Sequence, residues 1–228
     1  MSLILNIETA TTNCSVSLAK DGVLLVLREN NTPNYSHAEQ LHVFIEECMK
    51  EANYCMLDLD AVAVSKGPGS YTGLRIGVSS VKGLCFALNI PLIATDTLRC
   101  LAIQKAGKQY DFMVPCLDAR RMEVYAAIFN KKFEVVRETK AEIVAESYLS
   151  DYYLRGVTCV IGSGADKIAT LIKHPNLVFS LKSVPSALEM VHASYDKFIQ
   201  KDFEDLAYFE PYYLKDFILQ KPKKKTSE

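Results

Sequence analysis

A hairpin signal near the N-terminus constrains the fold most strongly. Asp21-Gly22 separates two strand-like runs, 14–20 and 23–29. An Asp-Gly pair favours a two-residue hairpin, because both turn residues must take positive φ. A third strand-like run, 3–8, precedes them and alternates apolar with polar residues. We therefore predict that the chain opens with an antiparallel meander of three strands.

Helices and short strands alternate after this meander. Ser36 and Glu39 have the spacing of a capping box, which predicts that a helix begins here, and apolar residues then recur at helical spacing. The next elements are predicted as a strand over 61–65, a helix over 74–88, a strand over 91–95 and a helix from Thr97. This order, β-β-β-α-β-α-β-α, resembles one half of the ASKHA fold, which actin, sugar kinases and heat-shock ATPases share.

The second half of the chain repeats this order in a weaker form. Its predicted elements are strands over 112–116, 123–129 and 133–137, a helix over 145–154, a strand over 158–161 and a helix over 166–172. Pro185 is predicted to open a further helix, because proline is favoured at the first helical position. We expect an α/β protein with two subdomains, 1–104 and 105–214, each a mixed sheet flanked by helices. The last segment is expected to pack back on the first subdomain, and the basic tail 215–228 to be disordered.

Composition excludes several classes of protein. The chain has 228 residues, of which 49% are hydrophobic and 23% charged, as in globular proteins that bury a core. Its net charge of −1 gives no chain-wide field that would attract nucleic acid. The N-terminus lacks the features of a signal peptide, and no apolar run reaches the ~18–20 residues of a membrane span. The seven cysteines form no C-x-x-C pair, so we expect reduced thiols, a cytoplasmic location and no membrane partner.

Two glycine-rich turns are candidate anion sites, because each joins a strand to the start of a helix. The first is not a P-loop, since Leu74-Arg75 follows Gly73 where a P-loop has Lys and then Ser or Thr. The alternative is a tight turn that lets helices and a sheet edge approach. The second turn resembles the adenosine-side turn of ASKHA nucleotide sites. No cofactor is certain, although ATP or ADP in or near the cleft is an option. The candidate glycines are Gly67, Gly69, Gly73, Gly162 and Gly164.

Small residues form a stripe on the helix predicted over 74–88. Gly73, Gly77 and Ser80 fall at positions i, i+4 and i+7, so another helix can approach closely. That helix belongs either to the same chain or to another protein.

Two further groups of residues are candidate sites. The four histidines include no pair spaced i, i+4, so no metal site is expected. A charged turn, made by Asp118, Arg120, Arg121 and Glu123, is interpreted as a paired surface turn or as a grip on a partner or an anionic ligand.

These motifs, in this order, resemble the TsaB family, also called YeaZ. The resemblance extends over the chain to about Leu214 and is most specific in the glycine-rich stretch. The segments that carry it are 6–9, 35–41, 67–77, 118–125 and 211–214. It implies an ASKHA protein that helps to make threonylcarbamoyladenosine next to the anticodon of tRNA. Within that pathway it implies a non-catalytic partner of the related enzyme TsaD, in a complex that TsaE joins, with tRNA contacted indirectly. It further implies that the chain forms a homodimer when alone, through the surface that binds TsaD.

The resemblance also bears on catalysis. TsaD holds a metal with a His-x-x-x-His pair, whose positions fall on Thr97 and Leu101 here, and neither replaces an imidazole. Asn6 stands where sugar kinases of this fold carry an Asp, and Glu8 replaces a glycine, so a phosphate would meet a carboxylate. Two rival functions stay open: a metallopeptidase-like enzyme and a nucleotide-binding regulatory module.

The two helices predicted over 36–53 and 74–88 are expected to bind the partner. Residues expected near that interface are Tyr35, His37, Leu41, Phe44, Tyr71, Leu74, Arg75, Gly77, Val78 and Val81.

Overall fold

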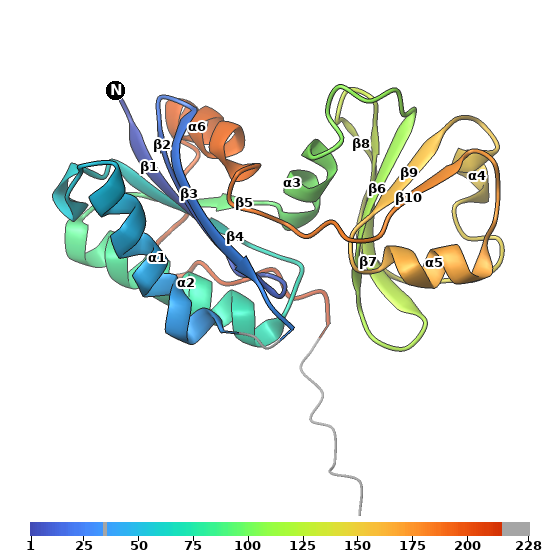
Figure 1. Cartoon of the computed structure of the whole chain (residues 1–228), viewed down its shortest axis with the longest axis horizontal. Coiled ribbons are helices and arrows are strands. Elements are labelled where there is room, and N and C mark those ends of the chain that lie inside the picture. Colours follow the sequence, from blue (N-terminus) through green and yellow to red (C-terminus); the bar gives the residue numbers. More distant parts are fainter. Residues whose placement is uncertain (34–35, 216–228) are drawn as a thin grey trace, which may run out of the picture.

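The computed structural model describes residues 1–33 and 36–215, and its chain forms two five-stranded sheets with helices around them (Figure 1). The strand orders are β3-β2-β1-β4-β5 and β10-β9-β6-β7-β8. In each sheet the first three strands are antiparallel and the last two are parallel to the first. Both sheets therefore repeat one topology, and the predicted ASKHA class, with two mixed sheets flanked by helices, is confirmed.

The strands of the first sheet follow the sequence pattern closely. Asp21 and Gly22 take φ of 49° and 75°, so the predicted hairpin is confirmed. The strands are β1 (Leu3–Glu8), β2 (Asn13–Lys20), β3 (Val23–Asn31), β4 (Ala61–Ser65) and β5 (Leu92–Thr95). Their alternation divides β1 between two cores, because Leu5 faces one helical layer while Ile4 faces another.

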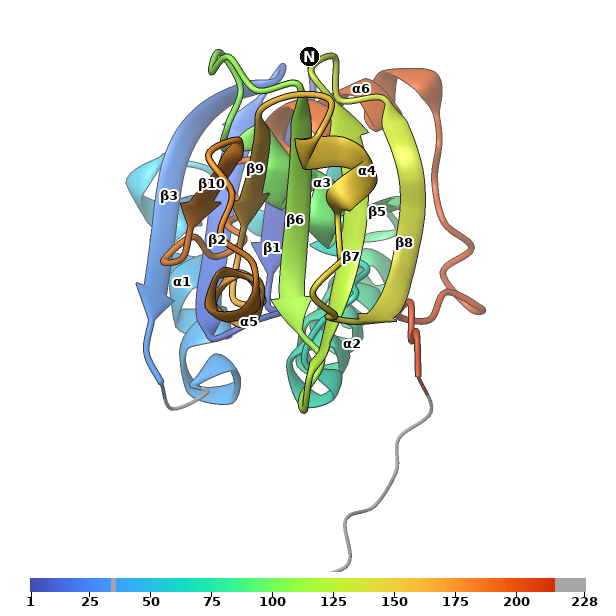
Figure 2. The ribbon, with the colours of Figure 1, turned by 90° about the vertical axis from the view of Figure 1, so that its right-hand side faces the viewer.

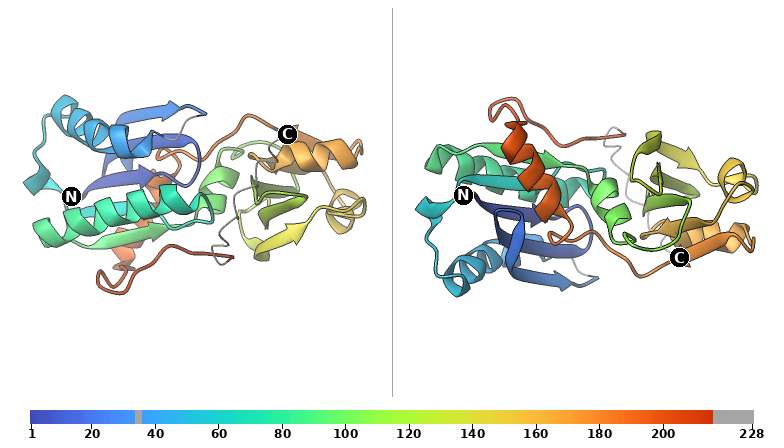
Figure 3. Two further views of the ribbon diagram at one scale, coloured as in Figure 1. Left: turned by 90° about the horizontal axis from the view of Figure 1, so that it is seen from below. Right: turned by 90° about the horizontal axis from the view of Figure 1, so that it is seen from above.

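Helices cover both faces of this sheet (Figures 1 and 3). On one face lie α1 (His37–Glu51) and α2 (Tyr71–Leu88), and on the other lies α6 (Met190–Gln200). We call β1–β5 with these three helices the first lobe. A short 3-10 helix, Met56–Asp58, precedes β4.

Two predicted helix starts need correction. The helix predicted from residue 74 begins at Tyr71, because the Ser70 hydroxyl caps it by accepting from Gly73 N at 3.3 Å. The capping box at Ser36 does not form. Ser36 has ψ of 17°, outside the extended range usual for an N-cap, and its side chain caps no backbone N–H.

The second sheet, with α4 and α5, makes the second lobe, seen face-on in Figure 2. Its strands are β6 (Phe112–Asp118), β7 (Glu123–Asn130), β8 (Val135–Ile143), β9 (Thr158–Ile161) and β10 (Leu177–Ser180). Its helices are α4 (Ser150–Tyr153) and α5 (Ala165–Leu171). The helix predicted over 145–154 is wrong for its first five residues, and β10 was not predicted.

The helix α3 (Thr97–Ile103) lies between the lobes (Figure 1). Leu98 and Leu101 pack in the core of the second sheet with Met113 and Phe129, whereas Cys100 packs in the α6 core of the first lobe. One short helix therefore joins the two cores.

The chain returns to the first lobe after β10. The helix predicted from Pro185 is wrong at its start, because α6 begins only at Met190 and the residues between them bond to β2. Ser17 Oγ donates to Ala187 O at 2.9 Å, and Ala187 N donates to Ser15 Oγ at 3.0 Å. These bonds tie the turn before α6 to β2.

The segment after α6, residues 201–215, runs along the first lobe and ends at the second. Glu204 N donates to Leu92 O at 2.9 Å, and Tyr212 N donates to Lys66 O at 2.7 Å. Lys215 then forms an ion pair with Glu123, at the start of β7. Of the tail predicted to be disordered, residues 216–228 lie outside the described residues. In the part of the chain that the structure describes, no helix has the length and apolar character needed to cross a membrane.

Candidate functional site

The first glycine turn is a packing device for the end of β1. A Cβ on Gly69 would lie 2.4 Å from Ala10 O, and one on Gly73 would lie 2.1 Å from Thr9 O. The space between the turn and β1 is therefore too small for any side chain. Ser70 N donates to Ala10 O at 2.7 Å, and Thr9 Oγ1 donates to Gly73 O at 2.8 Å. These contacts match the close-approach interpretation of the turn.

The same packing fixes which way the small-residue stripe of α2 faces. A Cβ on Gly77 would lie 2.3 Å from Thr9 Oγ1, so Gly73 and Gly77 face the protein's own β1–β2 turn. Among the expected interface residues, Gly77 thus lies against the same chain. The apolar residues expected at the interface also lie inside the first lobe: Leu41, Leu74, Val78 and Val81. These residues are at most 5% exposed, so their side chains pack inside this chain. Their place near a partner interface stays a prediction.

The other expected interface residues are divided between core, surface and the chain's own C-terminal segment. His37 is buried, and its Nε2 lies 2.7 Å from Thr11 O, while Phe44 is half-buried in the α1 core. Arg75 lies over the Tyr71 ring at 4.1 Å and donates from Nε to Tyr213 OH at 3.3 Å. Tyr35 lies outside the described residues.

A different surface of α1 and α2 is open. Phe86 is 81% exposed and Val43 is 49% exposed. Gly83 has no atom within 4 Å of its built Cβ position, in contrast to Gly73 and Gly77. Ser80 and His42 meet across the two helices, 3.3 Å between Oγ and Nε2. We call the exposed residues His42, Val43, Ser79, Gly83 and Phe86 the outer α1–α2 face.

A buried carboxyl lies at the end of β1, where the sequence suggested a vestigial phosphate turn. Glu8 is fully buried, and its Oε1 accepts from Ala10 N at 2.6 Å and from Ser65 Oγ at 2.8 Å. Burial raises the pKa of Glu8 to about 7, although these hydrogen bonds oppose the rise. Glu8 Oε2 and both polar side-chain atoms of Asn6 have no hydrogen-bond partner among the described residues.

The second glycine turn is built like the first. Gly162 has φ of 112°, and a Cβ there would lie 2.4 Å from Cys116 O. Gly164 N donates to Cys116 O at 3.1 Å, as Ser70 N does to Ala10 O in the first lobe. Because backbone donors of both turns bond to carbonyls of the same chain, the prediction of a bound nucleotide gains no support and stays a prediction.

The charged turn is joined to this second glycine turn. Asp118 N donates to Ser163 Oγ at 3.1 Å, and Lys167 Nζ lies 2.7 Å from Asp118 Oδ1. Arg120 N also donates to Asp118 Oδ1, at 2.6 Å. Arg120 and Arg121 themselves are exposed in the left-handed region, with φ of 66° and 48°. The turn is therefore a paired surface turn around Asp118, with both arginine side chains directed to solvent.

Comparison with known proteins identifies the family. The family model described as TsaD, tRNA N6-adenosine threonylcarbamoyltransferase, matches residues 32–224. The tRNA threonylcarbamoyladenosine biosynthesis protein TsaB of Escherichia coli K12 is 30% identical over 234 residues, with 96% of each chain covered. The chain belongs to the TsaB family.

Other relatives agree with this placement. The TsaB protein of Haemophilus influenzae is 27% identical, with 96% of this chain and 95% of that one covered. Two solved structures from Pseudomonas aeruginosa, one called YeaZ and the other said to be similar to peptidase YEAZ, have TM-scores of 0.81 and 0.82. Each is 25% identical, with 94% of this chain and 100% of the other covered.

In this TsaB-family chain, the two positions where the resemblance to TsaD placed a metal pair serve internal packing, and Thr97 Oγ1 accepts from Gly67 N at 3.1 Å. Thr97 and Leu101 are both fully buried, and Leu101 lies in the α3 core. Among residues 1–33 and 36–215, no group of three or more His, Cys, Asp or Glu side chains is arranged to hold a metal ion.

Proposed function

We propose that this TsaB-family chain acts in tRNA threonylcarbamoyladenosine biosynthesis as a non-catalytic partner of TsaD. The names of its full-length relatives support the pathway. Packing supports the absence of catalysis, because Glu8 and the two glycine turns face the chain's own atoms rather than an open site. The rival metallopeptidase would need a bound metal, so stoichiometric zinc or iron in the purified protein would count against this proposal.

The outer α1–α2 face is the proposed contact for TsaD, and its exposed Phe86 is the observation that carries this choice. A phenylalanine 81% exposed leaves apolar area in water, and its helical neighbours at i−3 and i−7, Gly83 and Ser79, are small. Gly83 beside it leaves room for a helix to approach, since nothing occupies its Cβ position. Aromatic anchors with close backbone approach are typical of the centres of interfaces.

Binding of TsaD to charge-bearing variants tests this contact. Phe86→Glu is expected to weaken binding at least about 100-fold, because a buried aromatic anchor is worth ~2–4 kcal/mol. Leu154→Glu is the matched control, since Leu154 is 68% exposed on the second lobe and should leave binding unchanged. Calorimetric titration measures both. If both variants bind TsaD equally well, Phe86 is not at the contact and this part of the proposal is wrong.

The same variants examine the proposed homodimer and the pathway role. If one face serves both pairings, Phe86→Glu also shifts the isolated chain to monomer in sedimentation experiments. Modification of tRNA is then measured with and without the chain. The assay contains TsaD, TsaE, threonine, bicarbonate, ATP and TsaC, the pathway protein that makes threonylcarbamoyl-adenylate. Modification that proceeds equally well without the chain would contradict the proposed role.

A further inference from the structure

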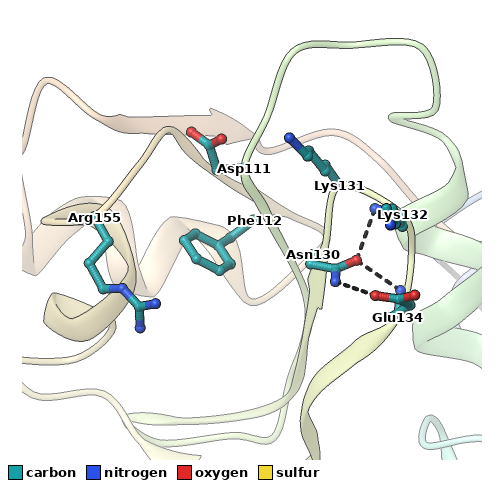
Figure 4. Close-up of a pocket in the computed structure, with 7 residues that line it drawn as sticks. All are labelled: Asp111, Phe112, Asn130, Lys131, Lys132, Glu134 and Arg155. Carbon is teal, nitrogen blue, oxygen red and sulfur yellow. Dashed lines mark hydrogen bonds between the residues drawn. The ribbon is translucent and has the colours of Figure 1, made fainter.

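A hollow of about 310 Å³ is lined by residues of the second lobe and by none of the outer α1–α2 face. Figure 4 shows its lining residues. Its walls come from the start of β6, the β7–β8 turn and the second residue after α4. They are Asp111, Phe112, Asn130, Lys131, Lys132, Glu134 and Arg155. Its volume falls at the lower end of the ~300–1,000 Å³ usual for small-molecule sites.

Three cations surround this hollow without acidic partners. Lys131, Lys132 and Arg155 form no salt bridge with any residue in the described ranges. Figure 4 shows Arg155 on one side and the two lysines on the other. Like charges that converge on one space repel one another, so an anion placed between them is favoured.

Two carboxylates also line the hollow, and the three cations outnumber them. Asp111 Oδ2 accepts from Val157 N at 2.9 Å, and Glu134 Oε2 accepts from Asn130 Nδ2 at 2.7 Å. The Asn130 side chain also accepts, through Oδ1, from Lys132 N at 2.9 Å and Glu134 N at 3.1 Å. These bonds hold the β7–β8 turn in one conformation, so the two lysines are presented from a fixed backbone.

An aromatic ring lies between the cations. Phe112 is half-buried, and Figure 4 shows its ring between Arg155 and Asn130. Tyr152 contacts it in a T-shaped arrangement, with centroids 5.3 Å apart and planes at 76°, which keeps the ring in place. Cations flanking an aromatic ring match a ligand that carries both a phosphate and a planar base.

We infer that this hollow binds a nucleotide unit, with the base on Phe112 and the phosphate between Arg155 and the Lys131–Lys132 turn. The unit is either a free nucleotide or one nucleotide of a single-stranded RNA. The site is separate from the two glycine turns, and from the face proposed for TsaD, so it goes beyond the proposed function.

Binding is measured for AMP by calorimetry, and for a 5′-phosphorylated single-stranded RNA octamer with a 3′ fluorophore by anisotropy. The variant Lys131→Glu/Lys132→Glu is expected to weaken binding at least about tenfold, and to lower the salt slope for RNA by about 1.4, at ~0.7 for each phosphate contact. Phe112→Leu keeps the apolar packing and is expected to weaken binding about fivefold or more, because stacking on the ring is lost.

Lys50→Glu/Lys182→Glu is the matched control, because it makes the same change in net charge at two exposed positions outside the hollow. It should change affinity less than twofold. Binding of both AMP and RNA identifies a free nucleotide as sufficient, whereas binding of RNA alone identifies the strand as the source. The inference is overturned if neither ligand binds, if both charge variants lose affinity equally, or if inorganic phosphate competes as well as AMP. TsaD binding by Lys131→Glu/Lys132→Glu and by Phe112→Leu should stay unchanged, so the proposed function and this inference fail separately.

Discussion

The two lobes share one strand topology but use it differently. In each, a glycine after the fourth strand packs against the end of the first strand: Gly69 against Ala10 O, and Gly162 against Cys116 O. The helices that follow differ in length, since α2 has 18 residues and α5 has 7. The shared turn thus accompanies the topology in both lobes, whereas only the first lobe has the long helices that carry the face proposed for TsaD.

The largest difference in stability is expected between alanine substitutions at two glycines of α2. Gly73→Ala should cost more than about 3 kcal/mol, because its Cβ would lie 2.1 Å from Thr9 O, a backbone atom that cannot turn away. Gly83→Ala should instead stabilise the protein by up to about 1 kcal/mol, because its position is open and alanine favours helix. Urea unfolding of both variants measures the difference. Equal stabilities would mean that α2 does not pack on the β1–β2 turn.

The next largest difference is in how stability depends on pH at the two carboxyl residues that end β1 and β6. Glu8 is buried with its pKa raised to about 7, whereas Asp118 is exposed and paired with Lys167. A raised folded-state pKa means that folding favours the protonated form. Stability from Glu8 is therefore full below about pH 4.5 and is lost as pH rises to about 7. The loss amounts to about 3 kcal/mol, at ~1.4 kcal/mol for each pKa unit.

The Glu8→Gln variant should lack this pH dependence, and it should be more stable than the parent protein at pH 8. Asp118→Asn should keep the pH dependence and lose less than about 1 kcal/mol, as exposed pairs do. Thermal unfolding from pH 4.5 to pH 8 compares the three proteins. A parallel decline in the Glu8→Gln variant would assign the pH dependence to another group.

A smaller difference is expected between the positive-φ glycines of the two turns. Gly67 has φ of 108° with its nearest Cβ contacts at 3.1 Å, whereas Gly162 has φ of 112° with a contact at 2.4 Å. Alanine meets similar backbone strain at both positions, but a severe clash only at Gly162. Gly162→Ala should therefore cost about 2 kcal/mol more than Gly67→Ala, as measured by chemical unfolding.

The smallest difference in stability is expected between substitutions of the serines that precede α1 and α2. Ser70→Ala should cost about 1 kcal/mol, because the Ser70 hydroxyl caps α2. Ser36→Ala should cost little, because Ser36 makes no capping bond. Chemical unfolding of the two variants tests this. A larger loss for Ser36→Ala would indicate that the capping box predicted from the sequence forms in solution.

The sequence predicts the strands better than it predicts the functional surface. Local signals set the strands: Asp21-Gly22 defines the first hairpin, and β9 falls on the predicted residues 158–161. The strand β10 escaped prediction because it has four residues, of which only Leu177 is buried. Of the helix predicted over 145–154, only α4 is helical, because the residues before it form turns after β8.

The sequence of α2 does not show which side of the helix faces the interior of the protein. Apolar residues and glycines occupy more than one side of this helix, so periodicity alone does not say which side meets the sheet. The structure decides it through Thr9, which fills the space beside Gly73 and Gly77. Phe86 lies outside the buried side of α2, which includes Val78, Val81 and Cys85.

The return of the chain to the first lobe makes that lobe discontinuous in sequence, with the second lobe inserted into it. Until residues 187–198 have been synthesised, the face of the first sheet that carries Ile4 and Ile93 is only partly covered, because Ala187 and Met190 complete that core. A ribosome must therefore release nearly the whole chain before the half made first can close. Cutting the chain between the lobes would not yield two independent domains, but one lobe without part of its interior.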